Sequence, residues 1–570
     1  MKTIKILIGL FIVFGLFSCT KDFVEINKNP NAITSEEASA KYFVTNPQYK
    51  LYAPDRYPYW RAHLIHVDRY SGHFTFGFHS CWWSDELGYS YHSSYTNAAW
   101  GWLEGYFGNL NNFMGLTGPG GDFENEYMYA AGKIIKGLYY QMFTDIFGEI
   151  PYSEAGVEGI DLPKFDTQAE IYQGIIADLD DAMATIGSTL KTGDGVEDMA
   201  ENDLFCGGDL QKWKKLANTL KLRMALRAYG AEGATWAEAA IDAALSAPLL
   251  DEADGDILIE KDTEITQWNA ACYGDIWFNF GAGSDWNVGE VLINYLRDNN
   301  DPRLEKYAKP AEGGTFPFTR PDEGINPDGY ANFSKRINFI ANIIDNATGG
   351  DFTFTEWPDS AEISVPENTY YIGQPSRLNN KIKSMARHEF FSDPTDIVIQ
   401  KKQEGKPIFP EIVLTVAESY FLQAEAALLG FGSGLGGGSI QQLYQSGLTA
   451  AMALWGTAPT ADFQSSPMWT LTGTTGEQLE QISIQRWIAL YTDGFEAWSI
   501  VRESGYPAAL AAGVSDIDIF GLGDINGDYP TRMRYGTQVQ STNLDNYNAA
   551  VLRQGADVQN TQLWWAKKVK

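Results

Sequence analysis

Apolar residues recur at spacings of three and four in several segments of this chain. Across residues 126–147 they form one continuous stripe, which comprises Ile135, Leu138, Tyr139, Met142 and Ile146. Such a stripe is typical of a helix that buries one face. Gly148 and Pro151 follow the stripe and are expected to end this helix.

The same periodicity predicts two further helices in the first half of the chain. One covers residues 168–186, and the pair Asp166-Thr167 is a suitable N-terminal cap for it. The other covers residues 210–229, where Trp213 and Leu220 belong to the apolar stripe and are expected to be buried.

Arg223 and Arg227 share another face of this predicted helix, one turn apart.

From about 250 to 410 the pattern changes to short aromatic runs between Gly, Pro, Asn and Asp, which predict long loops and short strands. No helix of comparable length is expected there, apart from one near 291–297. Helical patterns return in three segments, at 414–429, 441–455 and 476–491. The predicted class is mainly α, and no clean repeat of tetratricopeptide period is evident.

The N-terminus has the features of an export signal. Lys2 and Lys5 precede an apolar run from residue 6 to residue 17, which is too short to span a bilayer permanently. The run ends in Leu16-Phe17-Ser18-Cys19, which is similar to a lipobox. Residues 1–18 are therefore predicted to be a lipoprotein signal peptide. Acylation of Cys19 would anchor the remaining chain to a membrane.

The overall charge excludes one class of function. The formal net charge is −31 and no basic cluster offsets it, so a phosphate backbone would be repelled and nucleic-acid binding is not expected. About 550 residues remain after the signal, which predicts two lobes or one large composite domain. The three other cysteines, Cys81, Cys206 and Cys272, are an odd number and do not suggest a disulfide framework.

Several short motifs together resemble the SusD/RagB family, the surface glycan-binding lipoproteins of Bacteroidetes. They occur in order across nearly the whole chain: DFVEINKNPN at 22–31, FGEIPY at 147–152, GDLQKW at 208–213, ANTLKLR at 217–223, AESYFLQAEA at 417–426, QRWIALY at 485–491, FEAW at 495–498, GYP at 505–507, PTRMRY at 530–535 and WW at 564–565. One departure is Gly536, which follows Tyr535 where the family usually has Tyr-Pro after the arginines.

The resemblance implies a SusD-like domain over residues 19–570. Four tetratricopeptide-like helix pairs would form a scaffold, with helical parts at about 97–249 and 411–505, and the loop-rich part at about 250–410 would carry the ligand site. The implied function is to bind an oligo- or polysaccharide at the outer membrane, facing the cell exterior, and to deliver it to a SusC-like TonB-dependent transporter, over which the protein sits as a lid. No catalysis is implied.

Aromatic residues in irregular segments are the candidate sugar-binding residues, because large rigid rings can stack on the C–H faces of sugars. Three groups stand out: Trp82, Trp83, Tyr89 and Tyr91; Trp277 and Trp286; and Trp357 with Tyr370 and Tyr371. We expect the tryptophans to keep open ring faces and to form one arc away from the helix pairs. The alternative is that these rings fill gaps between loops. Trp100 and Trp102 open a helix and are expected in the core.

Two segments contain side chains that could ligate a metal ion. Asp524, Asn526 and Asp528 place oxygen ligands at alternate positions, as calcium loops do, and Asp516 and Asp518 are close enough in sequence to add ligands. The twelfth position of that loop is Tyr535, so an EF-hand is excluded, and a solvated turn is the alternative to a structural calcium site. His63 and His66 could share a helix face, but no HExxH motif or cysteine pair supports zinc, and a structural role is expected.

Enzymatic signatures are missing from the sequence. There is no Gly-x-Ser-x-Gly elbow and no glycine-rich phosphate loop, and no other cofactor is expected. A glycosidase needs only two carboxylates about 5–10 Å apart, which sequence spacing cannot test. A surface glycoside hydrolase and a peptide-binding RagB-type lipoprotein therefore stay as alternatives, and the abundance of tryptophan in the loops favours sugar.

Overall fold

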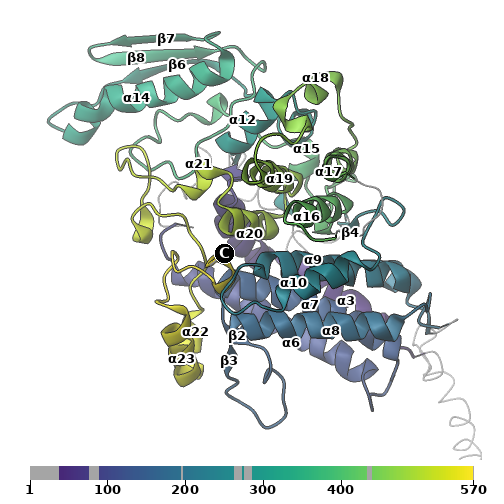
Figure 1. Ribbon diagram of the computed structural model, residues 1–570. Helices are drawn as coiled ribbons and strands as arrows, with labels where there is room; N and C mark the ends of the chain where they lie inside the picture. The colour runs from purple at the N-terminus through teal and green to yellow at the C-terminus, as the bar shows by residue number, and fades with distance from the viewer. Residues whose placement is uncertain are drawn as a thin grey trace, which may run out of the picture.

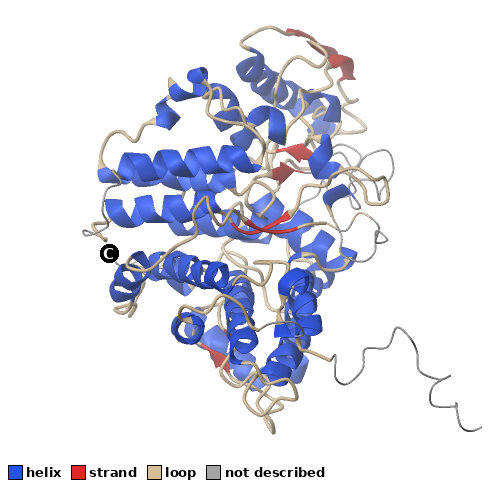
Figure 2. Ribbon diagram, turned by 90° about the vertical axis from the view of Figure 1, so that its right-hand side faces the viewer, coloured by secondary structure: helices blue, strands red, loops and turns tan. Residues whose placement is uncertain are grey.

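The computed structural model describes residues 38–75, 89–193, 197–261, 263, 272–274, 286–432 and 439–568. Helices make up most of the ordered elements, and strands occur only in small groups (Figure 2). The predicted mainly α class is confirmed. Within the described residues, no helix has the length and apolar character needed to cross a bilayer.

The helices of the first half lie side by side at one end of the molecule (Figure 1). They are α3 (Lys41–Tyr52), α6 (Ser93–Thr117), α7 (Glu126–Phe147), α8 (Gln168–Ile186), α9 (Leu210–Ala228) and α10 (Ala237–Leu245). Each helix from α6 to α10 packs against the next one along the chain. The predicted bounds of α7 and α8 are confirmed, and α9 ends one residue earlier than predicted.

Local signals explain where these helices start and end. Gly148 follows α7 with a φ of +88°, a conformation that glycine adopts without strain. Thr167 caps α8 in a reciprocal arrangement with Glu170, as a capping box requires. Trp213 and Leu220 are both 0% exposed, which confirms the predicted face of α9. Trp100 is also buried, as predicted, whereas Trp102 is half-buried.

The second half adds another layer of helices. The longer ones are α16 (Val416–Leu428), α17 (Ile440–Leu454), α19 (Thr475–Ala489) and α20 (Gly494–Ser504). The helix α16 packs against both α17 and α19, and it also contacts α9 of the first half. Shorter helices connect the main ones: α4 (Arg56–Pro58), a π-helix (Tyr59–Val67), α5 (Asp68–Tyr70), α12 (Glu290–Asp298), α13 (Leu304–Tyr307), α15 (Asp396–Ile399), α18 (Ala461–Gln464), α21 (Ala508–Ala511), α22 (Thr537–Thr542) and α23 (Leu544–Gln554).

Within the described residues, the strands form four small antiparallel groups. The pairs are β1 (Phe74–Thr75) with β5 (Asn287–Val288), β2 (Ile150–Pro151) with β3 (Phe165–Asp166), and β4 (Ile257–Ile259) with β9 (Glu411–Leu414). The only three-stranded sheet of the described chain has the order β6 (Gly314–Thr319), β8 (Ser360–Val365), β7 (Thr353–Trp357). Short 3-10 turns lie at Ala200–Asn202, His388–Phe390, Pro467–Trp469, Gly523–Ile525 and Trp564–Ala566.

One long helix contradicts the prediction for the loop-rich part. The helix α14 (Pro327–Thr348) has 22 residues, so the expectation that no helix of comparable length lies between 250 and 410 is wrong. Its apolar stripe buries Phe333, Ile337, Ile340 and Ile344 in the same core as the three-stranded sheet. The Gly, Asn and Pro residues around this stripe suggested a loop. In α14 they instead form the N-cap, the first helical position and the C-cap.

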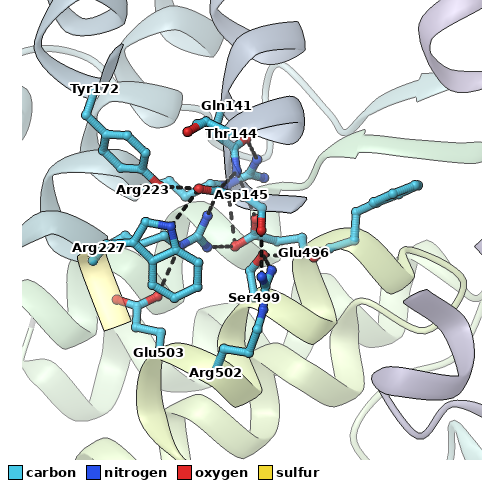
Figure 3. A network of polar contacts seen from close by, with 12 residues as sticks. Gln141, Thr144, Asp145, Tyr172, Arg223, Arg227, Glu496, Ser499, Arg502 and Glu503 are labelled. Carbon is cyan, nitrogen blue, oxygen red and sulfur yellow. Dashed lines mark hydrogen bonds and ion pairs between the residues drawn. The ribbon is translucent and has the colours of Figure 1, made fainter. Parts of the chain in front are cut away.

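A buried ionic network joins the two helical halves (Figure 3). Arg227 of α9 is 0% exposed and forms ion pairs with Asp145 of α7 at 2.7 Å, with Glu496 of α20, and with Glu503 of α20 at 3.3 Å. One turn away, Arg223 pairs with Glu418 of α16 at 2.5 Å. The arginine face of α9 is therefore buried between the two halves, because its partners lie on α7 of the first half and on α16 and α20 of the second.

Candidate ligand-binding region

The two-stranded ladder of β1 and β5 joins the segments that carry two of the predicted aromatic groups. Thr75 is opposite Asn287 in this antiparallel pair. Because the strands are antiparallel, the chain leaving β1 at residue 76 and the chain entering β5 at residue 286 meet the ladder at the same end. Trp82, Trp83 and Trp277 lie outside the described residues, so their role stays a prediction.

Buried polar side chains surround this end of the ladder. The Asn287 amide donates to Asp393 Oδ1 at 3.2 Å and to the Phe391 carbonyl at 3.4 Å, and it lies 3.4 Å from His388 Nδ1. The Thr75 hydroxyl donates to the side chain of Gln374. Asn287 Oδ1 and Gln374 Nε2 are buried without a hydrogen-bond partner among the described residues.

One cluster beside the ladder has the composition of a divalent-cation site. Glu312, His388 and Asp393 each place a ligand atom within 4.8 Å of the others. Glu312 is exposed and the other two are half-buried. One imidazole and two carboxylates form a donor set that suits zinc or manganese. Sequence analysis missed this group because its members are far apart along the chain and follow no motif spacing.

Two of the predicted aromatic residues are buried, which contradicts the expectation of open ring faces. Trp286 is only 1% exposed and belongs to the core that contains Phe74 and Val288. It directly precedes β5, so the pairing of that strand draws it into this core. Tyr89 is 3% exposed, and its hydroxyl donates to the Arg69 carbonyl at 2.8 Å. Neither ring can stack on a sugar in this conformation.

The other described members of the aromatic groups keep accessible area. Tyr91 is half-buried, and the Arg534 guanidinium lies 3.7 Å from the centre of its ring. Trp357 is 46% exposed at the end of β7, in the three-stranded sheet and not in the β1–β5 ladder. Tyr370 and Tyr371 are half-buried beside two different cores. The described residues therefore do not form the single open arc that we predicted.

The predicted calcium loop is organised by an arginine. The Arg377 guanidinium donates to the carbonyls of Gly521, Leu522, Gly527 and Asp528, at 3.1, 2.8, 2.8 and 2.8 Å respectively. Asp524 accepts from the Tyr91 backbone N–H at 2.6 Å, and Asp528 accepts from the Asn560 amide at 2.9 Å. Asn526 is exposed in the left-handed region, with a φ of +51°. Calcium binding at Asp524, Asn526 and Asp528 stays a prediction.

Neighbouring carboxylates and the N-terminal histidines have other contacts. Asp516 and Asp518 both bind Lys335, at 2.8 and 2.9 Å. His63 stacks on Tyr59 with 4.4 Å between ring centres. Burial lowers the pKa of His63 well below its usual value and lowers the pKa of His66 to about 4, so both imidazoles are neutral at physiological pH. These contacts are those of structural side chains.

Comparison with known proteins adds a family and a set of similar structures. A family model described as starch-binding and associating with the outer membrane matches residues 30–341 and 359–536. A solved chitin-binding protein is 25% identical, with a TM-score of 0.69, over 93% of this chain and 100% of that one. A SusD-like protein from Bacteroides thetaiotaomicron VPI-5482 is 21% identical, with a TM-score of 0.67, over 93% of this chain and 99% of that one. No protein with a curated description matches. The SusD-like helical fold that we predicted is confirmed.

Proposed function

This chain belongs to the SusD-like family, and from that membership we propose that it binds an oligosaccharide or polysaccharide at the cell surface without cleaving it. The observation that supports this proposal most is the family match over residues 30–341 and 359–536. The similarity to a chitin-binding protein, over 93% of this chain, points to the same class of ligand. We further propose that the lipid on Cys19 holds the protein at the outer membrane, facing outward, and that the glycan passes to a SusC-like TonB-dependent transporter.

The proposed site lies where the β1 and β5 strands end. Trp82, Trp83 and Trp277 are in the segments that join this ladder end, and their rings would supply the flat apolar faces that sugar rings need. Asn287 and Gln374 are 0% and 1% exposed, so these amides support the ladder and are not proposed to touch the ligand. Trp286 is buried, so it is not proposed to touch the ligand either.

Affinity electrophoresis of the full chain in detergent tests the proposal. We expect soluble starch or glycol chitin in the gel to slow migration, and incubation with either polymer to release no new reducing ends. New reducing ends would instead establish a glycoside hydrolase. Binding to a peptide library in place of both polymers would establish a peptide-binding protein.

Single substitutions locate the site. Trp82→Ala, Trp83→Ala and Trp277→Ala should each weaken binding by about 1–3 kcal/mol, as expected for a central aromatic in an interface. Trp469→Ala is the matched control, because this half-buried tryptophan lies in a 3-10 turn of the second helical layer. Equal retardation of all four variants and the wild type would refute the assigned residues, even if the protein binds glycans.

A further inference from the structure

The helical scaffold contains a pocket that lies outside the proposed loop site. It is bounded by α6, by α7 and by the segment that follows β2, and its volume is about 380 Å³. Small-molecule sites usually have volumes of about 300–1,000 Å³ and mostly apolar walls with a few polar groups. We refer to it as the α6–α7 pocket. All of its elements belong to the first helical half (Figure 1).

Aromatic rings form the walls of the α6–α7 pocket. Phe107, Tyr129 and Tyr152 line it and are all half-buried, so part of each side chain faces the opening. Two glycines hold two of these rings in place by close packing. A Cβ added at Gly156 would come within 2.8 Å of the Phe107 ring, and one added at Gly174 would come within 2.5 Å of the Tyr152 ring. The backbone at Gly156 and Gly174 therefore packs closely against the Phe107 and Tyr152 rings and restricts their positions.

A tyrosine hydroxyl opens on the same pocket without a protein partner. Tyr140 of α7 is 1% exposed, and no other described residue forms a hydrogen bond with its hydroxyl. Three other buried tyrosines of this bundle have protein partners. Tyr139 donates to the Leu103 carbonyl at 2.7 Å, Tyr106 to the Pro47 carbonyl at 2.8 Å and Tyr172 to Asp145 at 2.6 Å. This hydroxyl is not one of the buried polar atoms that lack a partner, so it reaches the open space of the pocket and can bond to a ligand there.

The charges around the pocket indicate which class of ligand it can bind. Lys136 is the cation in the lining, and it is already paired with Asp178 at 2.7 Å. The Tyr152 hydroxyl donates to the same carboxylate at 3.3 Å. No free positive charge is left in this set for an anionic ligand. A purely apolar ligand would leave the Tyr140 hydroxyl unsatisfied.

We propose that the α6–α7 pocket is a second saccharide subsite, which binds one or two neutral sugar units between the rings of Phe107 and Tyr129. The sugar ring stacks on these aromatic walls, and its hydroxyls bond to the Tyr140 hydroxyl and to the exposed Asn111 amide at the rim. This inference rests on the proposed glycan-binding function. It adds a site on the rigid scaffold to the one proposed at the β1–β5 ladder.

Calorimetric titration of the full chain in detergent tests this subsite, with maltohexaose and chitohexaose as probes. Hydroxyl-radical footprinting with the same probes should show protection of Met114 and Tyr129, which both line the pocket. Tyr140→Phe removes only the hydroxyl, keeps the buried ring and should weaken binding at this subsite by about three- to tenfold. Tyr129→Ala should weaken it by about tenfold or more.

Tyr127→Phe is the matched control, because this tyrosine is on the same helix but its hydroxyl accepts from Thr189 at 3.3 Å, outside the pocket. It should leave the affinity and the footprint unchanged, and the melting temperature of each variant verifies folding. Unchanged affinity in Tyr140→Phe and Tyr129→Ala, with no protection of Met114, would overturn the subsite and leave the proposed function intact. If the wild type binds neither probe at any site, the proposed function is overturned together with the subsite.

Discussion

Glu496 holds the two helical halves together through charge, and Glu496→Gln tests this directly. The carboxylate is 3% exposed, pairs with Arg227 and lies 3.9 Å from Arg223 and 3.8 Å from Arg486. Burial by itself would raise the pKa of this carboxyl. The arginine charges, above all that of Arg227, outweigh burial and lower the pKa from 4.5 to about 2.

The pKa of Glu496 sets the expected size of the effect. A tenfold change in proton affinity is worth about 1.4 kcal/mol, so a pKa lowered from 4.5 to about 2 contributes about 3 kcal/mol to stability at neutral pH. Removing one partner of a buried ion pair typically costs about 3–5 kcal/mol, which agrees with this value. We therefore expect Glu496→Gln to lower the free energy of unfolding by about 3 kcal/mol at pH 7.

Urea unfolding at pH 7 and at pH 3 measures this loss, with tryptophan fluorescence and far-UV circular dichroism recorded together to verify one cooperative transition. A lowered pKa stabilises the folded state above pH 4.5, and this stabilisation disappears as the pH falls towards 2. The difference between wild type and variant should thus fall to less than half at pH 3.

Asp55→Asn is the control for this experiment, because Asp55 pairs with Lys50 at 2.9 Å and its side chain is 52% exposed. An exposed pair of this kind should contribute less than about 1 kcal/mol. A loss in Glu496→Gln that is equal at pH 7 and pH 3, or smaller than about 1 kcal/mol at pH 7, would refute the electrostatic account.

Three further changes test the core, the pH dependence and the anchor. Leu220→Ala should cost about 2–5 kcal/mol in urea unfolding, because Leu220 is 0% exposed, whereas Leu552→Ala should cost almost nothing, because Leu552 is 87% exposed. Burial and the charge of Glu496 raise the pKa of Asp493 to about 8, so the wild type should lose stability as the pH rises from about 4 to 8. Asp493→Asn keeps the cap of α20 and should flatten that decline in unfolding experiments across this pH range; an unchanged slope would count against a protonated Asp493. Cys19→Ala should move the protein from the membrane fraction to the soluble fraction, and continued labelling by a fatty-acid probe would exclude Cys19 as the anchor.

The long helices could be predicted because their periodicity alone encodes a buried face. The stripe of α7 and the cap of α8 gave correct bounds, and Trp213 identified the correct face of α9. The second buried face of α9 could not be predicted in the same way. Arg223 and Arg227 resemble a solvated face in the sequence, and only their partners on α16 and α20 make burial possible.

Gly536 shows how a departure from a family motif can depend on a distant residue. A Cβ at this position would come within 2.7 Å of the Trp100 ring, so the turn after Tyr535 passes directly over that tryptophan. Trp100 is in α6 and Gly536 is near the C-terminus. No local pattern relates these two residues, and the close approach is a property of the tertiary structure only.

Tertiary contacts also decide which candidate site residues are exposed, and local sequence does not encode these contacts. Gly, Pro and Asn identify a segment as irregular, but they do not say what covers it, so Trp286 was expected to be open and is buried. Tyr139 and Tyr140 are neighbours on α7 and are indistinguishable by composition or period. One hydroxyl donates to the Leu103 carbonyl, and the other opens on a pocket with no partner among the described residues. Hydrogen-bond partners come from residues elsewhere in the chain, and a hydroxyl that opens on a pocket distinguishes a candidate binding residue from a core residue of the same type.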